Sequence, residues 1–318
     1  GAATFGSVFM DEDEPDKLYL FYSGAPDTEW THATIGVAIS NDGFNYTKLK
    51  DNPILEKVPN CFCHKEALTP AVTKIDNTYY MFLSGRASPN SPRGIGLAYA
   101  DDPKGPWCII GELIKPSPFS WEAPDIDNGP SVLKTRRDTC LVFYSNVLVS
   151  YRLGIFGIVL RRPRVRKVGI LKVRIGGTSL SEIEVDRFPN NPLNHLNGLW
   201  GSWNESLFCP GYIKLGNTHH LFPATSIYSI SPPKQYIGLA TSKSVSFSKE
   251  TTHIGKLIDG MSEKTQIMPN AKGEIFLDTP SPLLIEDEKK LFLYYAVEDT
   301  ADGIWRTALT TFKLRADD

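Results

Sequence analysis

The sequence contains no long apolar segment and no long amphipathic helix. None of its apolar runs approaches the about 20 residues that a membrane-spanning helix needs, so we expect no membrane partner. No run of helical period is longer than about two turns. The chain has 25 Gly, 23 Pro, 13 Tyr and 16 Phe, a composition that favours many short strands separated by turns. The sequence therefore predicts an all-β protein.

Several chemical motifs are absent too. The chain has no Gly-Xaa-Ser-Xaa-Gly motif and no phosphate-cradling glycine-rich loop, which argues against a nucleophile-elbow serine hydrolase and a P-loop enzyme. Its 5 cysteines match no zinc spacing, so we predict buried or loop thiols and no metal ligands. The formal net charge is only -2, and no aromatic-plus-basic strand pattern is found. We therefore expect no nucleic-acid partner.

The chain does contain one repeated sequence pattern. Its clearest copy is an apolar strand over Thr69–Lys74, a tight turn, an aromatic and β-branched strand over Thr78–Ser84, a Gly/Pro/Ser-rich loop and a small-residue strand over Gly94–Ala100. Similar copies begin near Ser7, Gly129, Cys209 and Thr279. They recur every roughly 60–80 residues, a period typical of repeat architectures.

The repeat predicts a five-bladed β-propeller, with antiparallel blades of three to four strands around a central funnel. One such sheet cannot bury its apolar face alone, and a ring of five solves that problem. A long β-sandwich is the alternative, but sandwiches do not repeat one strand–turn–strand–loop–strand pattern five times. We predict a single domain over residues 1–318, with blades at approximately 5–60, 61–120, 121–200, 201–272 and 273–318. In the third copy, the third strand is expected either near Gly154–Val159 or near Val168–Val173.

Segments of the second, third and fourth copies resemble glycoside hydrolase family 43. The segments that carry the resemblance are Thr69–Val72, Asn77–Met81, Ile95–Ala98, Asp102–Trp107, Asp125–Val132 and Glu205–Lys214. The first copy, through Ile35–Ala38 and Asn41–Phe44, is also similar to the mannoside phosphorylases of family 130. The resemblance covers Ser7 to Leu314 and implies a five-bladed propeller glycosidase.

The chain departs from both families at positions where they carry acids. The family 43 base would stand at Phe5-Gly6, and its second-blade Asp aligns with Ala71. In the family 130 register, the usual Glu-Asp is Leu68-Thr69. The usual base is therefore not found, and a non-catalytic carbohydrate-binding propeller and a glycoside phosphorylase stay open as alternatives to a glycoside hydrolase.

The candidate site residues are acids just before a predicted innermost strand, because such side chains point into the funnel. Glycoside cleavage needs one protonated and one ionised carboxyl group. The predicted catalytic residues are Asp127, Glu205, Asp278 and Glu66, with Glu205 as general acid and Asp127 or Asp278 as base. The predicted substrate-binding residues are Trp121 and Trp203 as stacking surfaces, Arg86, His64, Asp125 and Glu122.

We expect a hydrolase acting on poly- or oligosaccharide, with no cofactor; the resemblance leaves room for a structural calcium ion in the central channel. Oligomeric state and sugar specificity are not predicted. The chain begins Gly1-Ala2-Ala3, so we expect a secreted or periplasmic protein if a leader was removed and a cytoplasmic one otherwise. The basic cluster Arg161–Lys167 is interpreted as a solvated hairpin, or as a contact for an anionic glycan, phosphate or protein. The turn acids of Asp11–Asp16 are expected to be solvated.

Overall fold

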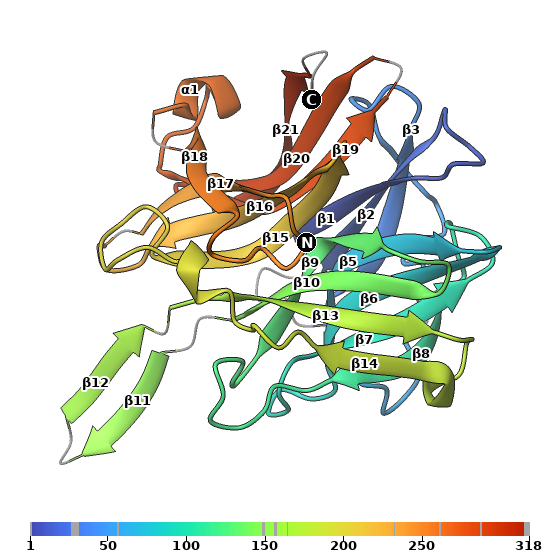
Figure 1. The fold of residues 1–318 in the computed structure, drawn as a ribbon, viewed down its shortest axis with the longest axis horizontal. Coiled ribbons are helices and arrows are strands. Elements are labelled where there is room, and N and C mark those ends of the chain that lie inside the picture. Colours follow the sequence, from blue (N-terminus) through green and yellow to red (C-terminus); the bar gives the residue numbers. More distant parts are fainter. Residues whose placement is uncertain are drawn as a thin grey trace.

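The protein is a ring of five antiparallel sheets. The computed structural model describes residues 2–26, 32–55, 57–147, 150–155, 158–163, 165–231, 233–260, 262–286 and 288–314. Within these residues, each of the five sheets has three or four strands, and two further strands pair as a separate hairpin. Figure 1 shows the N-terminal strand at the centre of the molecule, where the first strands of the sheets converge. The predicted fold, an all-β five-bladed propeller, is confirmed.

The five blades follow one another along the chain. Blade 1 contains β1 (Ala2–Met10), β2 (Leu18–Ala25), β3 (Thr34–Ser40) and β4 (Thr47–Lys48); blade 2 contains β5 (Glu66–Ile75), β6 (Thr78–Arg86), β7 (Gly94–Ala100) and β8 (Cys108–Ile114). Blade 3 contains β9 (Ile126–Lys134), β10 (Thr139–Asn146), β13 (Val168–Ile175) and β14 (Ile183–Arg187). Blade 4 contains β15 (Ser206–Leu215), β16 (Thr218–Ile227), β17 (Lys234–Ser242) and β18 (Thr252–Asp259). Blade 5 contains β19 (Ile275–Ile285), β20 (Lys290–Asp299) and β21 (Ile304–Lys313).

The remaining elements are short. The hairpin consists of β11 (Ser150–Ile155) and β12 (Ile158–Pro163), and the helical turns are η1 (Leu180–Glu182), η2 (Asn194–Leu196) and α1 (Lys264–Ile267). The strand that pairs with β10 is β13. The third strand of blade 3 therefore lies at the second of the two predicted places, and the first place belongs to the hairpin.

A separate apolar cluster fills each interface between consecutive blades. Trp107 and Phe21 meet between blades 1 and 2, and Phe82 and Tyr144 share the cluster between blades 2 and 3. The clusters between blades 3 and 4 and between blades 4 and 5 contain the aromatic residues Phe143, Tyr212, Phe247, Phe222 and Tyr295. A smaller cluster of Leu18, Leu283, Phe292 and Tyr294 joins blade 5 to blade 1. Apolar packing between neighbouring blades therefore closes the ring without a shared strand.

The innermost strands β1, β5, β9, β15 and β19 all contain a register shift at about the same depth. In four of them the shift includes an Xaa-Pro pair, and Thr69, Cys209 and Thr279 before the proline have φ of 49°, 43° and 44°. Proline lacks a ladder N–H and is tolerated at bulges, whereas a positive φ is unfavourable for residues with a Cβ. These bulges bend the strands where they face the funnel and re-aim the preceding side chains.

Blades 3, 4 and 5 approach one another most closely at these bulges. A Cβ atom on Gly129 would collide with the carbonyl oxygen of Pro210, and one on Gly211 would collide with that of Pro280. Glycine is therefore required at both positions, because backbone touches backbone there.

Serines on the second strands tie neighbouring blades together. The Oγ of Ser23 accepts a hydrogen bond from the Thr69 amide at 3.0 Å, and the Oγ of Ser84 accepts one from the Asn128 amide at 2.7 Å. The Oγ of Ser145 likewise accepts from the Cys209 amide at 3.2 Å. Each serine therefore accepts a hydrogen bond from a buried amide at the bulge of the next blade. The distorted strand pairing at the bulge leaves that amide without a backbone acceptor.

Asp11 corrects the expectation that the acids of the first turn are solvated. Its side chain is buried and accepts hydrogen bonds from Tyr79 and, at 3.0 Å, from the Nζ of Lys74. Burial raises the pKa of Asp11, but the bonds from Tyr79, the Asp13 amide and Lys74 outweigh burial and lower it. Asp11 therefore links blade 1 to blade 2.

The serine ties predict a measurable contribution to stability. Ser84→Ala should lower the free energy of unfolding by about 1–3 kcal/mol, because the buried amide of Asn128 loses its acceptor. Urea unfolding followed by circular dichroism measures the change. The exposed Ser262→Ala is the control and should differ from wild type by less than about 0.5 kcal/mol. An unchanged midpoint for Ser84→Ala would show that the tie is dispensable.

Candidate active site

The funnel has one end at which most of the predicted site residues gather. The strands β5, β9, β15 and β19 begin at this end, the second strands finish there, and the third strands start there. Antiparallel pairing therefore places Glu66, Asp127, Glu205 and Asp278 on the same end of the ring, which we call the mouth. Arg86 and Arg93, at the end of β6 and before β7, lie at the mouth as well.

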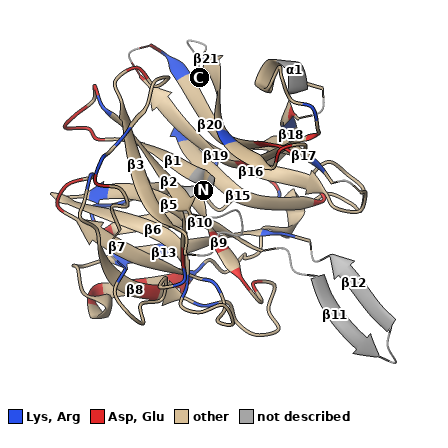
Figure 2. Ribbon diagram, turned by 180° about the vertical axis from the view of Figure 1, so that it is seen from behind, with Lys and Arg blue, Asp and Glu red and all other residues tan. Residues whose placement is uncertain are grey.

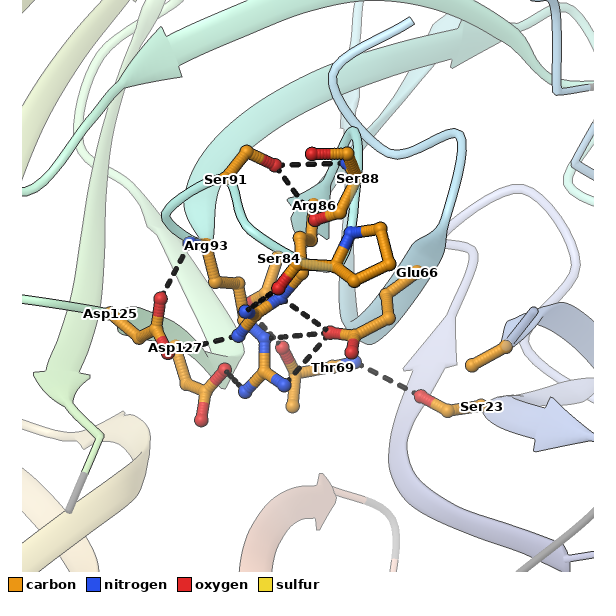
Figure 3. A network of polar contacts seen from close by, with 12 residues as sticks. Ser23, Glu66, Thr69, Ser84, Arg86, Ser88, Ser91, Arg93, Asp125 and Asp127 are labelled. Atoms are coloured by element: carbon orange, nitrogen blue, oxygen red, sulfur yellow. Dashed lines mark hydrogen bonds and ion pairs between the residues drawn. The ribbon is translucent and has the colours of Figure 1, made fainter. Parts of the chain in front are cut away.

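Ion pairs connect blades 2 and 3 across the mouth (Figure 3). The guanidinium of Arg93 donates to Glu66 Oε2 at 2.8 Å and, through Nη1, to Asp127 Oδ1 at 2.9 Å. Arg86 donates to Asp125 Oδ2 at 2.9 Å and lies 3.4 Å from Glu66 Oε2. The Arg93 amide donates to Asp125 Oδ1 at 2.7 Å. We call Glu66, Arg86, Arg93, Asp125 and Asp127 the mouth network.

A second group lies deeper, where β9, β15 and β19 contact one another. Arg166 Nη2 is 3.6 Å from Asp127 Oδ2 and 3.8 Å from the Sγ of Cys209. The thiol of Cys209 in turn hydrogen-bonds Asp278. The Arg166 guanidinium also stacks on the Phe208 ring at 4.1 Å. These residues, Asp127, Arg166, Cys209 and Asp278, form the central cluster, and they bring side chains of blades 3, 4 and 5 together.

Burial sets the protonation behaviour of the central cluster. Burial raises the pKa of Asp278 to about 6, although Arg166, the Thr279 amide and Cys209 partly offset it. The Thr279 amide donates to Asp278 Oδ1 at 2.6 Å. Burial also raises the pKa of the Cys209 thiol, which therefore stays protonated at neutral pH. Asp278 is thus a carboxyl group that exchanges a proton near neutral pH.

Arg166 corrects the interpretation of the basic cluster. A solvated hairpin was one of the two interpretations of Arg161–Lys167, beside a contact for an anionic glycan, phosphate or protein. For Arg166 the solvated reading is wrong, because its side chain is buried in the funnel and its Nε donates to the Asn146 carbonyl at 2.9 Å. Its amide donates to Ser206 Oγ at 2.7 Å, and its carbonyl accepts from the Leu207 amide. These bonds dock the segment between the hairpin and β13 onto blade 4. Arg164 lies outside the described residues, and nothing is concluded about the side chains of Arg161 and Arg162.

Glu205 lies at the mouth under two loops. Its Oε2 accepts from the Gly201 amide at 3.1 Å and from the Ser229 hydroxyl at 2.7 Å, whereas its buried Oε1 finds no hydrogen-bond partner among the described residues. Its exposed fraction is 2%, compared with 8% for Asp127 and 9% for Asp278. Glu205 therefore joins the loop before β15 to the loop after β16, and it is more enclosed than the two aspartates.

Glu122 stands apart from both groups. Its Oε1 accepts from Arg187 Nε at 2.8 Å and from the Tyr144 hydroxyl at 2.7 Å, and its Oε2 accepts from the Ser117 amide at 3.2 Å. Burial raises the pKa of Glu122, but the bonds from Arg187 and Tyr144 outweigh burial and lower it. These contacts occupy both carboxylate oxygens of Glu122, and its substrate-binding role stays a prediction.

The two tryptophans predicted to stack on sugar pack within their own blades. Trp121 lies 5.3 Å from the Tyr144 ring, in space that the absent side chain of Gly169 leaves free. Trp203 meets the Tyr236 ring edge-on at 6.4 Å. Both rings remain partly exposed, so their predicted stacking role stays a prediction. His64 is exposed on the loop before β5, with its amide bonded to the Cys61 carbonyl.

The described residues offer no cluster of three or more His, Cys, Asp or Glu arranged to hold a metal ion. At the mouth and in the centre, the carboxylates face guanidinium groups, so the calcium ion that the resemblance allows does not fit these residues. No helix in the described part of the chain is long and apolar enough to span a membrane. Figure 2 shows charges of both signs interspersed along loops and strand ends of the blades.

Two site residues, Arg93 and Arg166, were missed by sequence reasoning. Arg93 directly precedes the repeated small-residue strand that begins at Gly94. Because the third strand of a blade starts at the mouth, its position in the repeat could have identified Arg93 as a mouth residue. Arg166 carried no such signal, because it sits in an insertion among other basic residues. Only the folded structure distinguishes Arg166 from the other basic residues of this insertion.

Solved structures that share this fold include glycoside hydrolases. A thermostable family-43 glycoside hydrolase matches 100% of this chain and 91% of its own, with a TM-score of 0.64 and 15% identity. An endo-arabinase from Bacteroides thetaiotaomicron VPI-5482 matches 98% of this chain and 95% of its own (TM-score 0.64, 12% identity). An alpha-L-arabinanase from Cellvibrio cellulosa, solved with arabinohexaose, matches 100% and 94% (TM-score 0.62, 13% identity). No family model and no curated protein matches the sequence. The resemblance to this superfamily is confirmed at the level of the fold.

The raised pKa of Asp278 predicts a pH-dependent stability. Ionisation of Asp278 opposes folding, since its pKa is about 6 in the folded protein against 3.8 for an ordinary Asp. The free-energy cost of ionising the buried Asp278 is absent below pH 4 and reaches its full value above pH 6. Asp278→Asn should therefore gain on the order of 3 kcal/mol in free energy of unfolding relative to wild type as the pH rises between these limits. Urea unfolding of both proteins from pH 4 to pH 8 measures it; a constant difference would contradict the assignment.

The mouth network predicts that removal of one of its arginines lowers the stability of the protein considerably. Arg93→Ala should lower the free energy of unfolding by up to about 3–5 kcal/mol at neutral pH, because Glu66 and Asp127 each lose the closer of their two arginine partners at low solvent exposure. Arg137, whose pair with Asp76 is exposed, provides the control, and Arg137→Ala should cost less than about 1 kcal/mol. Equal effects of the two variants in denaturant titrations would rule out a buried network.

Proposed function

We propose that this protein is a glycoside hydrolase that cleaves poly- or oligosaccharides with the carboxyl groups of its funnel. The observation that carries the proposal is the central cluster, in which Asp278 and Asp127 flank the Arg166 guanidinium. The fold supports it, since the solved structures with this architecture include arabinanases and a family-43 hydrolase. A carbohydrate substrate follows from the same argument.

The two aspartates suit different steps of glycoside cleavage. The reaction needs a carboxyl group that protonates the leaving oxygen and a carboxylate that acts as base or nucleophile. Asp278, with a pKa of about 6, keeps a protonated fraction near neutral pH and is the proposed proton donor. Asp127, paired with Arg93 and Arg166, is the proposed carboxylate. Glu205, predicted as general acid, remains a second candidate for the donor, and Glu66 orients Arg93.

The ion pairs of the mouth network favour a second function, a non-catalytic carbohydrate-binding propeller. Glu66, Asp125 and Asp127 already accept from Arg86 and Arg93, so part of their charge serves the fold. In that case the funnel binds sugar hydroxyl groups without bond cleavage.

A screen with nitrophenyl glycosides and arabinan, xylan and mannan oligosaccharides tests the proposal, with and without inorganic phosphate. Asp278→Asn should lower turnover about 10²–10⁴-fold while circular dichroism stays unchanged. The wild-type rate should fall as the pH rises above 6, because the donor loses its proton. Asp138→Asn, an exposed residue paired with Arg174, is the control and should retain full activity.

The remaining outcomes distinguish the alternatives. Full turnover by Asp278→Asn with loss in Glu205→Gln would make Glu205 the donor. Turnover only with phosphate would indicate a phosphorylase, and sugar binding without turnover would indicate the binding propeller. Activity retained by both variants would falsify a reaction in the funnel.

A further inference from the structure

The loop that leads into β15 presents two large apolar side chains to solvent. Trp200 is 69% exposed and Leu199 is 86% exposed. By contrast, Trp107, Trp121 and Trp203 all pack against neighbouring residues. Exposure on this scale gives Trp200 little part in the core, so its large ring surface is available for another purpose.

The loop is held in a defined conformation by its own hydrogen bonds. The amide and hydroxyl of Ser202 donate to the Leu199 carbonyl at 2.9 Å and 2.7 Å, and the Gly198 amide donates to the Asn204 carbonyl at 2.8 Å. Gly201, with φ of 81°, supplies the left-handed residue that the turn requires. Trp200 therefore sits on a preorganised turn, and a ligand pays little ordering entropy when it binds there.

Glu205 connects this turn to the funnel. Its Oε2 accepts from the Gly201 amide, directly after Trp200, and from the amide and hydroxyl of Ser229 at 3.4 Å and 2.7 Å. Ile230, 39% exposed, follows Ser229. Glu205 is 2% exposed, so the bonds it accepts hold the two loops together at the mouth. The exposed apolar residues thus belong to the mouth, beside a predicted site carboxylate.

We propose that Trp200, together with Leu199, forms a carbohydrate-stacking subsite on the rim of the funnel. Sugar rings bury C–H faces against flat aromatic surfaces while their hydroxyl groups bond polar groups at the edge. Ser202, Asn204 and Ser229 surround the turn and provide such polar groups. The three exposed apolar residues, Leu199, Trp200 and Ile230, are far fewer than the roughly 20–30 residues per partner of a stable protein interface, which favours a sugar over a protein.

The subsite rests on the proposed function only for its choice of ligand. It adds a stacking role for Trp200, whose ring is exposed, whereas the rings of Trp121 and Trp203 are only partly exposed. Because the subsite lies on the rim, it contacts a residue of a chain that extends out of the funnel. A polysaccharide therefore uses it, whereas a short aryl glycoside does not.

Native electrophoresis in gels containing arabinan, xylan or mannan tests the subsite without any need for turnover. At least one polysaccharide should retard the wild-type protein. Trp200→Ala should weaken this binding about 5- to 20-fold, and Trp200→Phe should keep part of it, as expected for loss of a stacked ring. Phe44→Ala is the matched control: Phe44 is 64% exposed but follows β3 at the opposite end of the ring, so its loss should leave retardation unchanged.

The outcomes separate this inference from the proposed function. Turnover of nitrophenyl glycosides unaffected by Trp200→Ala, with weaker polysaccharide retardation, supports both. Retardation that depends on Trp200 without turnover of any substrate supports the subsite and contradicts the hydrolase. Equal retardation of wild type and Trp200→Ala, or no retardation of the wild type by any of the three polysaccharides, overturns the subsite whatever the turnover.

Discussion

Two guanidinium groups of low solvent exposure, those of Arg93 and Arg166, are the constraint on which the funnel depends. Arg93 holds Glu66 of blade 2 and Asp127 of blade 3, and Arg166 reaches from Asp127 to Cys209 of blade 4. Carboxylates brought together at low solvent exposure repel one another and are costly to bury. The arginines offset both costs, so four blades share a polar centre that would otherwise drive them apart. Asp278 is the exception, and burial raises its pKa because its contacts compensate its charge only in part.

The innermost strands explain why the acids face one another. Each strand carries a bulge at about the same depth, and Asp127 and Asp278 stand just before theirs. Buried serines on the neighbouring blade partner the bulge amides in blades 2 to 4. The packing of the ring therefore maintains the unfavourable backbone conformation of Thr69, Cys209 and Thr279. The strained residue of each bulge lies close to a candidate site residue.

Sequence reasoning predicted the ring and most of the acids at its mouth, because both follow from a periodic pattern. Repeated strand types give blades, and blade starts give the positions of Glu66, Asp127, Glu205 and Asp278. It misplaced side chains whose environment depends on distant residues. Asp11 was expected in solvent but lies against Lys74 and Tyr79 of the next blade. The ring contacts of Trp121 and Trp203 could not be read from the sequence either, because glycines on distant strands make room for both rings.

The division between the two kinds of information has a simple physical basis. Period, turn chemistry and strand composition are local properties, and they are enough to specify an all-β five-bladed propeller with acids at the strand starts. The pairing of those acids is not local: Arg166 and Asp278 are far apart in the chain, and Arg166 lies in an insertion that the repeat does not describe. Which carboxyl is ion-paired, which keeps a proton and which tryptophan remains exposed are decided by burial and charge in the assembled ring. Those quantities exist only after the blades have packed.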